Sequence, residues 1–265
     1  MSAPSNMSFL EHLETLRWHL IRGFSLVIIL GVIAFICNEF IFDQIILAPR
    51  QPDFITNRLL CQLSQWLNIP LLCINQQPML LKNISMSGQF TTHITVSFIT
   101  GAIMAFPYFI WELWRFVNPA LTPTETSKSK GFIFIVSLLF FIGILFGYYI
   151  ITPMSIDFLA NYQVSTQVPN EITLNSYIST ITSIVLSAGV IFELPVLIWF
   201  LAKLNIVSAA FLRQYRRHAI LVIVIVAAII TPPDVISQIM VSLPMIILYE
   251  AGIVIARNIE KQRSL

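Results

Sequence analysis

Charged side chains are scarce in this chain of 265 residues, of which 11% are Asp, Glu, Lys or Arg and 57% are hydrophobic. A soluble domain of this length cannot bury so many apolar side chains, so the scarcity of charge excludes a soluble globular protein. The net charge of +2 is too small, and the cations are too scattered, for a nucleic-acid-binding surface. The composition predicts a polytopic membrane protein.

Motifs for catalysis and for metal binding are missing as well. The sequence has no HExxH pair, no glycine-rich phosphate loop and no pair of intramembrane aspartates of the kind that some proteases use. Its four histidines stand apart and fall mostly at the ends of apolar runs, where an interfacial role suits them better than metal coordination. We therefore expect no enzyme, no metal site and no cofactor.

Cysteine is rare, with three residues in the chain. Cys37 falls near the end of the first apolar run, where packing accounts for it. Cys61 and Cys73 share one loop, and an oxidising compartment would permit a disulfide between them. Free thiols are the default expectation, and the sequence alone leaves the pairing open.

Long apolar runs are what the sequence has in abundance. They are continuous and not alternating, and backbone groups in lipid must be satisfied within their own segment, so we expect helices. Prolines at positions 107, 195 and 244 predict kinks. The predicted fold class is all-α, a single membrane domain over residues 1–265 with six transmembrane helices, at 23–42, 90–111, 131–151, 177–202, 213–230 and 235–256.

The cations set the orientation of this six-span arrangement. Only Arg50, Arg58 and Lys82 of the fifteen Lys and Arg residues fall on one side, and all the others fall on the opposite side. The positive-inside rule therefore places both termini in the cytoplasm. The first run is too long for the apolar part of a signal peptide and has no small-residue cleavage pattern, so we expect it to stay as an anchor.

The segment from 43 to 89 is the longest connection and lies outside in this topology. Within it Ile55, Leu59, Leu63 and Trp66 recur at helical spacing, which predicts an amphipathic helix. This helix either lies on the outer membrane surface or packs as a lid over the spans, and the sequence favours neither.

The last two spans form an unusual hairpin. Between His218 and Thr231 only about twelve residues are uniformly apolar, roughly 18 Å of helix against a hydrocarbon core of about 30 Å. Pro232 and Pro233 cannot continue the helix, and Asp234 can cap the next one. We expect short fifth and sixth spans, and our hypothesis is that they thin the bilayer beside them.

A single carboxylate, Glu193, lies in an apolar run from 172 to 202 that holds no other charge. About ten residues separate it from Lys203, roughly 15 Å along a helix, which places it near the bilayer midplane. A lone intramembrane acid is a functional-site hypothesis. The alternative is a structural Glu that holds helices together through hydrogen bonds, with Ser183, Ser187 or Gln238 as partners.

Acidic residues also occur on the cytoplasmic side, where cations are the rule. Glu11 and Glu14 precede the first span, and Glu125 follows the second. Together these carboxylates would suit a ligand with guanidinium groups, because the two pair through charge-assisted hydrogen bonds. The alternative is local pairing with cations such as Arg17 and Lys128.

Several motifs resemble the TatC family, the multi-spanning receptors of the twin-arginine protein translocase. They occur in the family's order and cover nearly the whole chain. They are FLEHLETLR at 9–17, AP at 48–49, WRFVNPAL at 114–121 followed by Glu125, FELP at 192–195, and TPPDV at 231–235 with Ser237 and Gln238.

This resemblance implies a concave helical bundle in the bacterial cytoplasmic (inner) membrane that binds twin-arginine signal peptides. It implies transport of folded proteins with single-span TatA and TatB-type partners, driven by the proton motive force, together with self-association and contact with membrane lipid. The implied residues are Glu11, Glu14, Arg17, Phe116, Pro119 and Glu125 for the signal peptide, Glu193, Thr231 and Gln238 for partner helices within the membrane, and Pro49, Pro232, Pro233 and Asp234 for the outer caps.

The sequence departs from the family pattern at Thr15, where an acid usually precedes the Leu-Arg pair. Glu14 is adjacent but about 100° around the helix, so it is no simple replacement. Ala120 stands where many members have Gly. These departures raise the weight on Glu125.

Two other classes of function are open at this point. A secondary transporter or proton channel could use Glu193 as its ion site, although such folds usually show paired repeats that this sequence lacks. A pure assembly scaffold would need no cytoplasmic acidic pocket.

Overall fold

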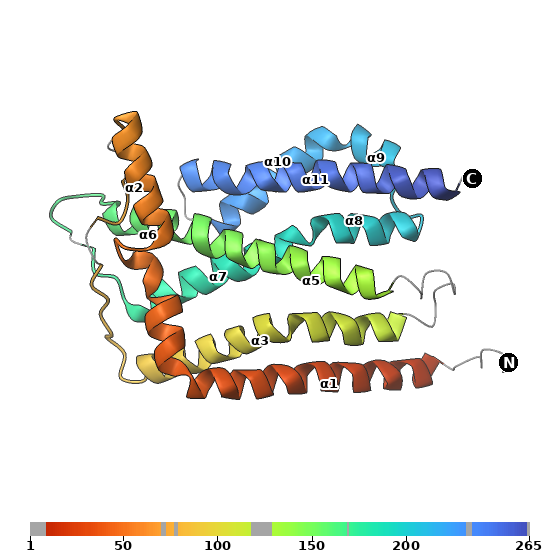
Figure 1. Ribbon diagram of the computed structural model, residues 1–265, viewed down its shortest axis with the longest axis horizontal. Helices are drawn as coiled ribbons and strands as arrows, with labels where there is room; N and C mark the ends of the chain where they lie inside the picture. Colours follow the sequence, from red (N-terminus) through yellow and green to blue (C-terminus); the bar gives the residue numbers. More distant parts are fainter. Residues whose placement is uncertain are drawn as a thin grey trace. The chain divides into compact units, whose positions relative to one another are not determined.

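The computed structural model describes residues 9–69, 73–76, 79–117, 129–168, 170–231 and 235–263. Within these ranges no strand occurs, apart from one isolated bridge between Lys82 and Thr173, so the all-α prediction is confirmed. The helices, labelled in Figure 1, are α1 (Phe9–Ile36), η1 (Phe40–Ile46), η2 (Ala48–Arg50), α2 (Ile55–Leu67), α3 (Gly88–Val117), α5 (Ser129–Phe146), η5 (Gly147–Ile151), α6 (Thr152–Asn161), α7 (Leu174–Phe192), α8 (Leu194–Lys203), α9 (Ala209–Gln214), α10 (Arg216–Ile230) and α11 (Val235–Arg263).

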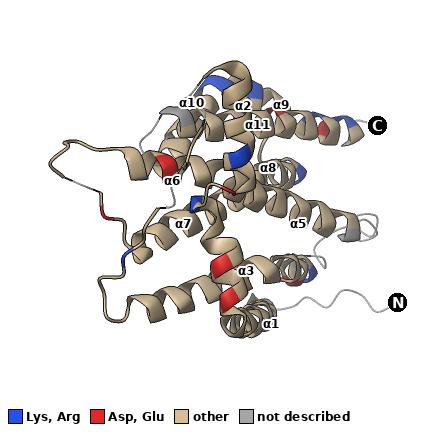
Figure 2. Cartoon of the chain, turned by 60° about the vertical axis from the view of Figure 1, so that its left-hand side comes forward, with Lys and Arg blue, Asp and Glu red and all other residues tan. Residues whose placement is uncertain are grey.

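The chain forms two compact units. The first comprises Met1–Asn38 and Phe90–Leu138, and therefore holds α1, α3 and the first part of α5. The second comprises Glu39–Gln89 and Leu139–Leu265. Charged residues are sparse along the helices of both units, as Figure 2 shows by the long uncharged stretches of ribbon.

In the first unit, α1 and α3 lie side by side because small residues let their backbones meet (Figure 1). A Cβ atom built on Gly101 would lie 2.5 Å from the backbone N of Gly31. One built on Gly23 would lie 2.6 Å from the ring of Phe109. The close backbone approach of Gly101 to Gly31 is typical of helices packed in membranes, where no water drives them together.

In the second unit, α11 packs along α8 and α10 (Figure 1). Their buried side chains form one apolar cluster, which includes Ile198, Ala227, Met245 and Ile253. In the same unit α5 packs closely against α7, since a Cβ on Gly143 would lie 2.6 Å from the carbonyl oxygen of Ala188.

Five helical segments of the described chain are long and apolar enough to cross a membrane. They are Leu13–Ile36, Gly88–Phe116, Gly131–Asn161, Leu174–Lys203 and Ser237–Gln262. The remaining predicted span, 213–230, corresponds to α10, which has 15 residues and a length of about 22 Å. The fifth predicted span is therefore a short helix, and its crossing of the membrane stays a prediction.

The prediction of a short sixth span is wrong, because α11 has 29 residues. It runs through Pro244 without a break and continues past the apolar residues into Arg257–Arg263. Charged residues end an apolar run in the sequence, but they are good helix formers and do not end the helix. Only one arm of the hairpin is short.

The helix predicted in the segment 43–89 is α2. Its polar side chains are buried and its apolar side chains are exposed, the opposite of a helix that packs on a protein core. Asn57 and Ser64 are buried, whereas Ile55 and Leu59 are exposed and Trp66 is 84% exposed. The apolar face of α2 therefore points away from the rest of the second unit, so α2 is not held against that unit by its apolar side chains.

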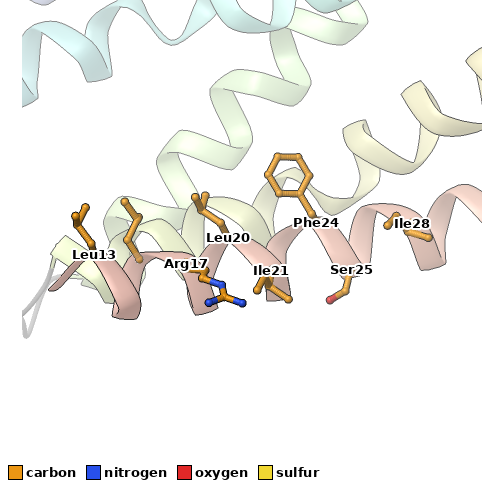
Figure 3. A pocket seen from close by; sticks show the side chains of 8 residues that line it. Leu13, Arg17, Leu20, Ile21, Phe24, Ser25 and Ile28 are labelled. Atoms are coloured by element: carbon orange, nitrogen blue, oxygen red, sulfur yellow. The ribbon is translucent and has the colours of Figure 1, made fainter. Parts of the chain in front are cut away.

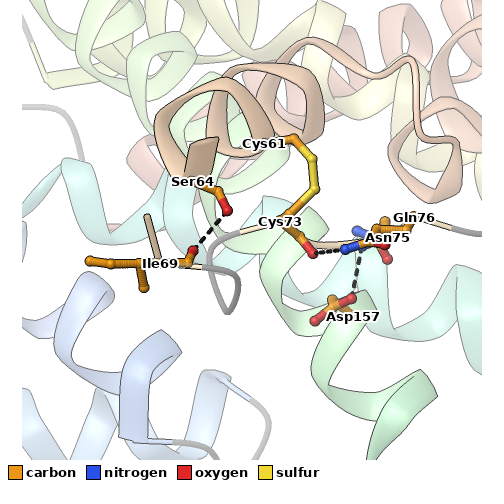
Figure 4. The surroundings of a disulfide bond; sticks show 7 residues. All are labelled: Cys61, Ser64, Ile69, Cys73, Asn75, Gln76 and Asp157. Carbon is orange, nitrogen blue, oxygen red and sulfur yellow. Dashed lines mark hydrogen bonds between the residues drawn. A yellow bond between two sulfur atoms is a disulfide. The ribbon is translucent and has the colours of Figure 1, made fainter. Parts of the chain in front are cut away.

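Cys61 and Cys73 form a disulfide, in contrast to the default expectation of free thiols (Figure 4). The bridge links α2 to the segment that holds Asn75. The backbone N–H of Asn75 donates to Asp157 Oδ1 over 2.8 Å. The Asn75 side chain donates to the carbonyl oxygen of Pro153 over 2.9 Å. The disulfide and these bonds fasten the segment to α6.

Candidate functional site

Four of the six predicted signal-binding residues lie on the two long helices of the first unit. Glu14 and Arg17 are exposed on α1, and Phe116 is half-buried in the last turn of α3. Glu11 belongs to α1, but its side chain lies outside the described part of the chain. Pro119 and Glu125 also lie outside the described residues, so the predicted gathering of the carboxylates stays a prediction.

An open, shallow depression runs along the exposed side of α1 beside these residues (Figure 3). Its lining is almost entirely apolar and comes from α1 alone, with Leu13, Leu20, Phe24 and Ile28 spaced along it. Figure 3 shows the Arg17 guanidinium pointing away from the Leu20 and Phe24 side chains. This surface combines one cation with an apolar stripe.

Glu112 is not among the residues predicted from the sequence, and it is the most completely buried acid among the described side chains of the first unit, at 2% exposure. Its carboxylate pairs with His19 Nδ1 across the two helices and accepts a hydrogen bond of 2.9 Å from the Tyr108 hydroxyl. Arg115 Nη1 lies 3.7 Å from one oxygen, and Arg22 Nη1 lies 3.8 Å from the other. The Glu112 carboxylate is thus surrounded by donors and cations from both α1 and α3.

A sequence signal for this cluster existed. Tyr108 and Arg115 stand four residues before and three residues after Glu112, the two spacings that meet on one helix face. The predicted span ends at Trp111, so Glu112 falls beyond it among the residues expected at the surface. The helix continues to Val117, and Glu112 lies on its inner face.

The cluster also contacts aromatic rings at the predicted signal-binding surface. The His19 ring meets the ring of Phe116 edge-on at a centroid distance of 6.3 Å. The Arg115 guanidinium lies 4.8 Å from the centre of the Trp111 ring, within the range of a cation–π interaction. The positions of Phe116 and Arg115 therefore depend on the same group of side chains as Glu112.

In the second unit, Glu193 lies where α7 ends and α8 begins. Pro195 falls in the first turn of α8, where its missing N–H breaks no helix bond, and it ends α7 before it. Both carboxylate oxygens of Glu193 are buried, and neither makes a hydrogen bond of normal geometry to a described residue. The backbone of Phe140 on α5 interacts with this carboxylate electrostatically.

The other intramembrane candidates lie on α10 and α11. Gln238 donates to the carbonyl oxygen of Val224 over 3.3 Å and so links the two helices. The buried Thr231 hydroxyl donates to the carbonyl oxygen of Ala227 at the end of α10. Neither bonds to Glu193 in the described residues, so the structural reading of Glu193 with Gln238 as its partner is not supported.

Of the predicted caps, Pro49 is buried in η2, and its carbonyl oxygen accepts a hydrogen bond of 3.1 Å from the Asn57 side chain. Pro232, Pro233 and Asp234 lie outside the described residues. Within the described ranges no group of three or more His, Cys, Asp or Glu residues could hold a metal ion.

Long apolar helices, close glycine-mediated packing and two buried acids define the class as a polytopic α-helical membrane protein. Residues 11–244 match the family described as Sec-independent protein translocase protein (TatC). The chain belongs to this family, whose role is protein transport.

Relatives and solved structures agree with this assignment. The Sec-independent protein translocase protein TatC of a Blattabacterium species is 38% identical over 98% of both chains. The protein of the same name from Carboxydothermus hydrogenoformans is 36% identical over 96% of this chain and 94% of its own. A crystal structure of a twin-arginine translocase receptor, TatC, superposes with a TM-score of 0.70 at 27% identity, covering 92% of this chain and 98% of the other. Nothing in these comparisons supports a secondary transporter or proton channel.

Proposed function

We propose that this chain is the receptor and core subunit of a twin-arginine translocase. It binds the twin-arginine signal peptides of folded proteins and moves these proteins across the membrane with TatA and TatB-type partners, using the proton motive force. The observation that carries this proposal is the family match over residues 11–244, together with the likeness to solved receptor structures.

The signal peptide binds at the cytoplasmic ends of α1 and α3. Glu11, Glu14 and Glu125 supply carboxylates for the two guanidinium groups, while Arg17, Phe116 and Pro119 shape the surface around them. The exposure of Glu14 and the position of Phe116 beside a fixed charged cluster support this assignment. The apolar part of the signal peptide follows the apolar side chains that line α1.

Glu193, Thr231 and Gln238 receive the partner helices within the membrane. A helix break and a buried carboxylate without a regular hydrogen bond support this role for Glu193, because a partner helix can supply the missing donor. Pro49, with Pro232, Pro233 and Asp234, shapes the outer caps. The chain forms one membrane domain, self-associates and contacts lipid through its apolar helices.

The protein resides in a bacterial cytoplasmic (inner) membrane with both termini in the cytoplasm. The cation distribution supports this orientation, since all but three of the fifteen Lys and Arg residues fall on the cytoplasmic side of a six-span chain.

Export of a reporter protein tests the proposal. Cells without their own TatC receive this chain with its cognate partner subunits, and the reporter carries either a twin-arginine signal or a twin-lysine control. Export that depends on the arginine pair is the expected result. Stable insertion and assembly without any export would contradict the receptor function.

A further inference from the structure

Glu112 is a buried acid of the first unit that has no part in the proposed signal contacts. It is 2% exposed and lies between α1 and α3, whereas the side chains of its two Arg neighbours are each 47% exposed. A buried carboxylate is expensive unless cations and donors surround it, and here His19, Tyr108, Arg22 and Arg115 do so.

The two Arg distances indicate the kind of interaction. At 3.7 and 3.8 Å the Arg nitrogens are too far from the Glu112 oxygens for hydrogen bonds, but they are close enough for charge pairing. The closest contacts, to His19 and Tyr108, hold the carboxylate in place. Glu112 is thus fixed by hydrogen bonds and offers its charge to two Arg side chains that reach the surface.

The cations near the proposed signal site outnumber the acids there, so the charge of Glu112 affects how a cationic ligand approaches. Arg17, Arg22 and Arg115 bring three cations to the described ends of α1 and α3, where an arginine pair has to approach. Glu14 and Glu112 are the acids that oppose them among the described side chains of these two ends. Without Glu112, two half-exposed guanidinium groups would face the incoming ligand uncompensated.

We propose that Glu112 is a positioning residue for signal-peptide binding, which neutralises Arg22 and Arg115 and fixes His19 beside Phe116. This inference rests on the proposed receptor function. The buried carboxylate touches no ligand. It removes like-charge repulsion against the signal arginines and keeps the aromatic edge of the site in place.

The test measures binding of a fluorescent twin-arginine peptide to the full-length protein in lipid nanodiscs at low and at high salt. Glu112→Gln keeps the shape and removes the charge; it keeps one of the two oxygens that bond His19 and Tyr108, and replaces the other with an amide NH2 group. We expect binding roughly two- to fivefold weaker at low salt, with the difference narrowing at high salt because salt screens exposed charges. A loss that is equal at both salt concentrations would indicate a purely structural role and overturn the proposal.

Arg115→Gln gives the opposite prediction and changes a side chain that is half-exposed, so it avoids the core. It should tighten peptide binding at low salt, and the double variant Glu112→Gln with Arg115→Gln should return close to wild type. Weaker binding by Arg115→Gln alone would overturn the proposal, even if Glu112→Gln failed to fold.

Glu250→Gln is the matched control, because it removes one carboxylate that pairs with Arg216 over 2.6 Å in the second unit. It should leave peptide binding unchanged. A twin-lysine peptide separates the two levels of inference. Loss of arginine-dependent binding in the wild type contradicts the receptor function itself, whereas wild-type binding with no effect of Glu112→Gln contradicts only the role of Glu112.

Discussion

Two buried glutamates show how differently one residue type can be accommodated. Glu112 is enclosed by His19, Tyr108 and two Arg side chains, so each oxygen has partners within the first unit. Glu193 lies at a helix break with both oxygens buried and without a regular hydrogen bond in the described residues. A satisfied buried acid contributes to the fold, whereas an unsatisfied one is a cost that a function has to justify.

The first prediction concerns Glu193→Gln, which removes an acid whose two oxygens make no regular hydrogen bond to a described residue. We expect the free energy of unfolding to stay within about 1 kcal/mol of wild type or to rise, because no hydrogen-bonded charge is lost. Export of the twin-arginine reporter should nevertheless fall. The measurements are the denaturation midpoint in detergent and reporter export. Glu250→Gln serves as a control, and a clear loss of stability would show that Glu193 is a structural residue.

At the scale of the elements, glycines set how closely the helices approach. Gly101 on α3 lies against the backbone of α1, and Gly143 on α5 lies against that of α7. Gly131, near the start of α5, has no atom within 4 Å of the position that a Cβ would occupy. Gly101 and Gly131, both in the first unit, therefore have very different surroundings.

A matched pair of substitutions tests this difference. Gly101→Ala forces α1 and α3 apart and should lower stability by about 1–3 kcal/mol, despite the better helix propensity of Ala. Gly131→Ala gains that propensity without a clash and should raise stability by up to about 1 kcal/mol. Thermal unfolding of both variants in the same detergent is the measurement. Equal effects would contradict the close packing of α1 against α3.

The helices were largely predictable because apolar runs of membrane length have few other solutions in lipid. The break at Glu193 was predicted only as a kink at Pro195, since the sequence does not say whether a proline bends a helix or ends it. Pro107 and Pro244 lie within continuous helices. The burial of Glu112 depends on pairing with His19, which is 93 residues away, and no local pattern contains such a contact.

At the scale of the whole molecule, the Cys61–Cys73 disulfide bears on the direction in which the chain is inserted. Disulfides persist in oxidising compartments and are rare in the cytosol. An outer location for residues 43–89 would satisfy this chemistry, and the distribution of Lys and Arg favours the same location on separate grounds.

Single cysteines introduced into a Cys37→Ser background test this orientation. We expect Gln262→Cys, in the last turns of α11, to react with a membrane-impermeant maleimide only after the membrane is permeabilised. Gln167→Cys, in the connection between α6 and α7, should react in intact cells. Labelling of Gln262→Cys in intact cells would contradict a cytoplasmic C-terminus.

The short helix α10 determines whether the number of membrane crossings is odd or even. From the disulfide-bonded segment onward, the segments long enough to cross are four: Gly88–Phe116, Gly131–Asn161, Leu174–Lys203 and Ser237–Gln262. An even number of crossings would return the cationic end of α11 to the outer side. The chain ends on the side where it began only if α10 crosses as well, with its 15 residues. With both termini in the cytoplasm, as proposed above, parity requires α10 to cross although its length alone does not, so this helix would decide on which side the chain ends.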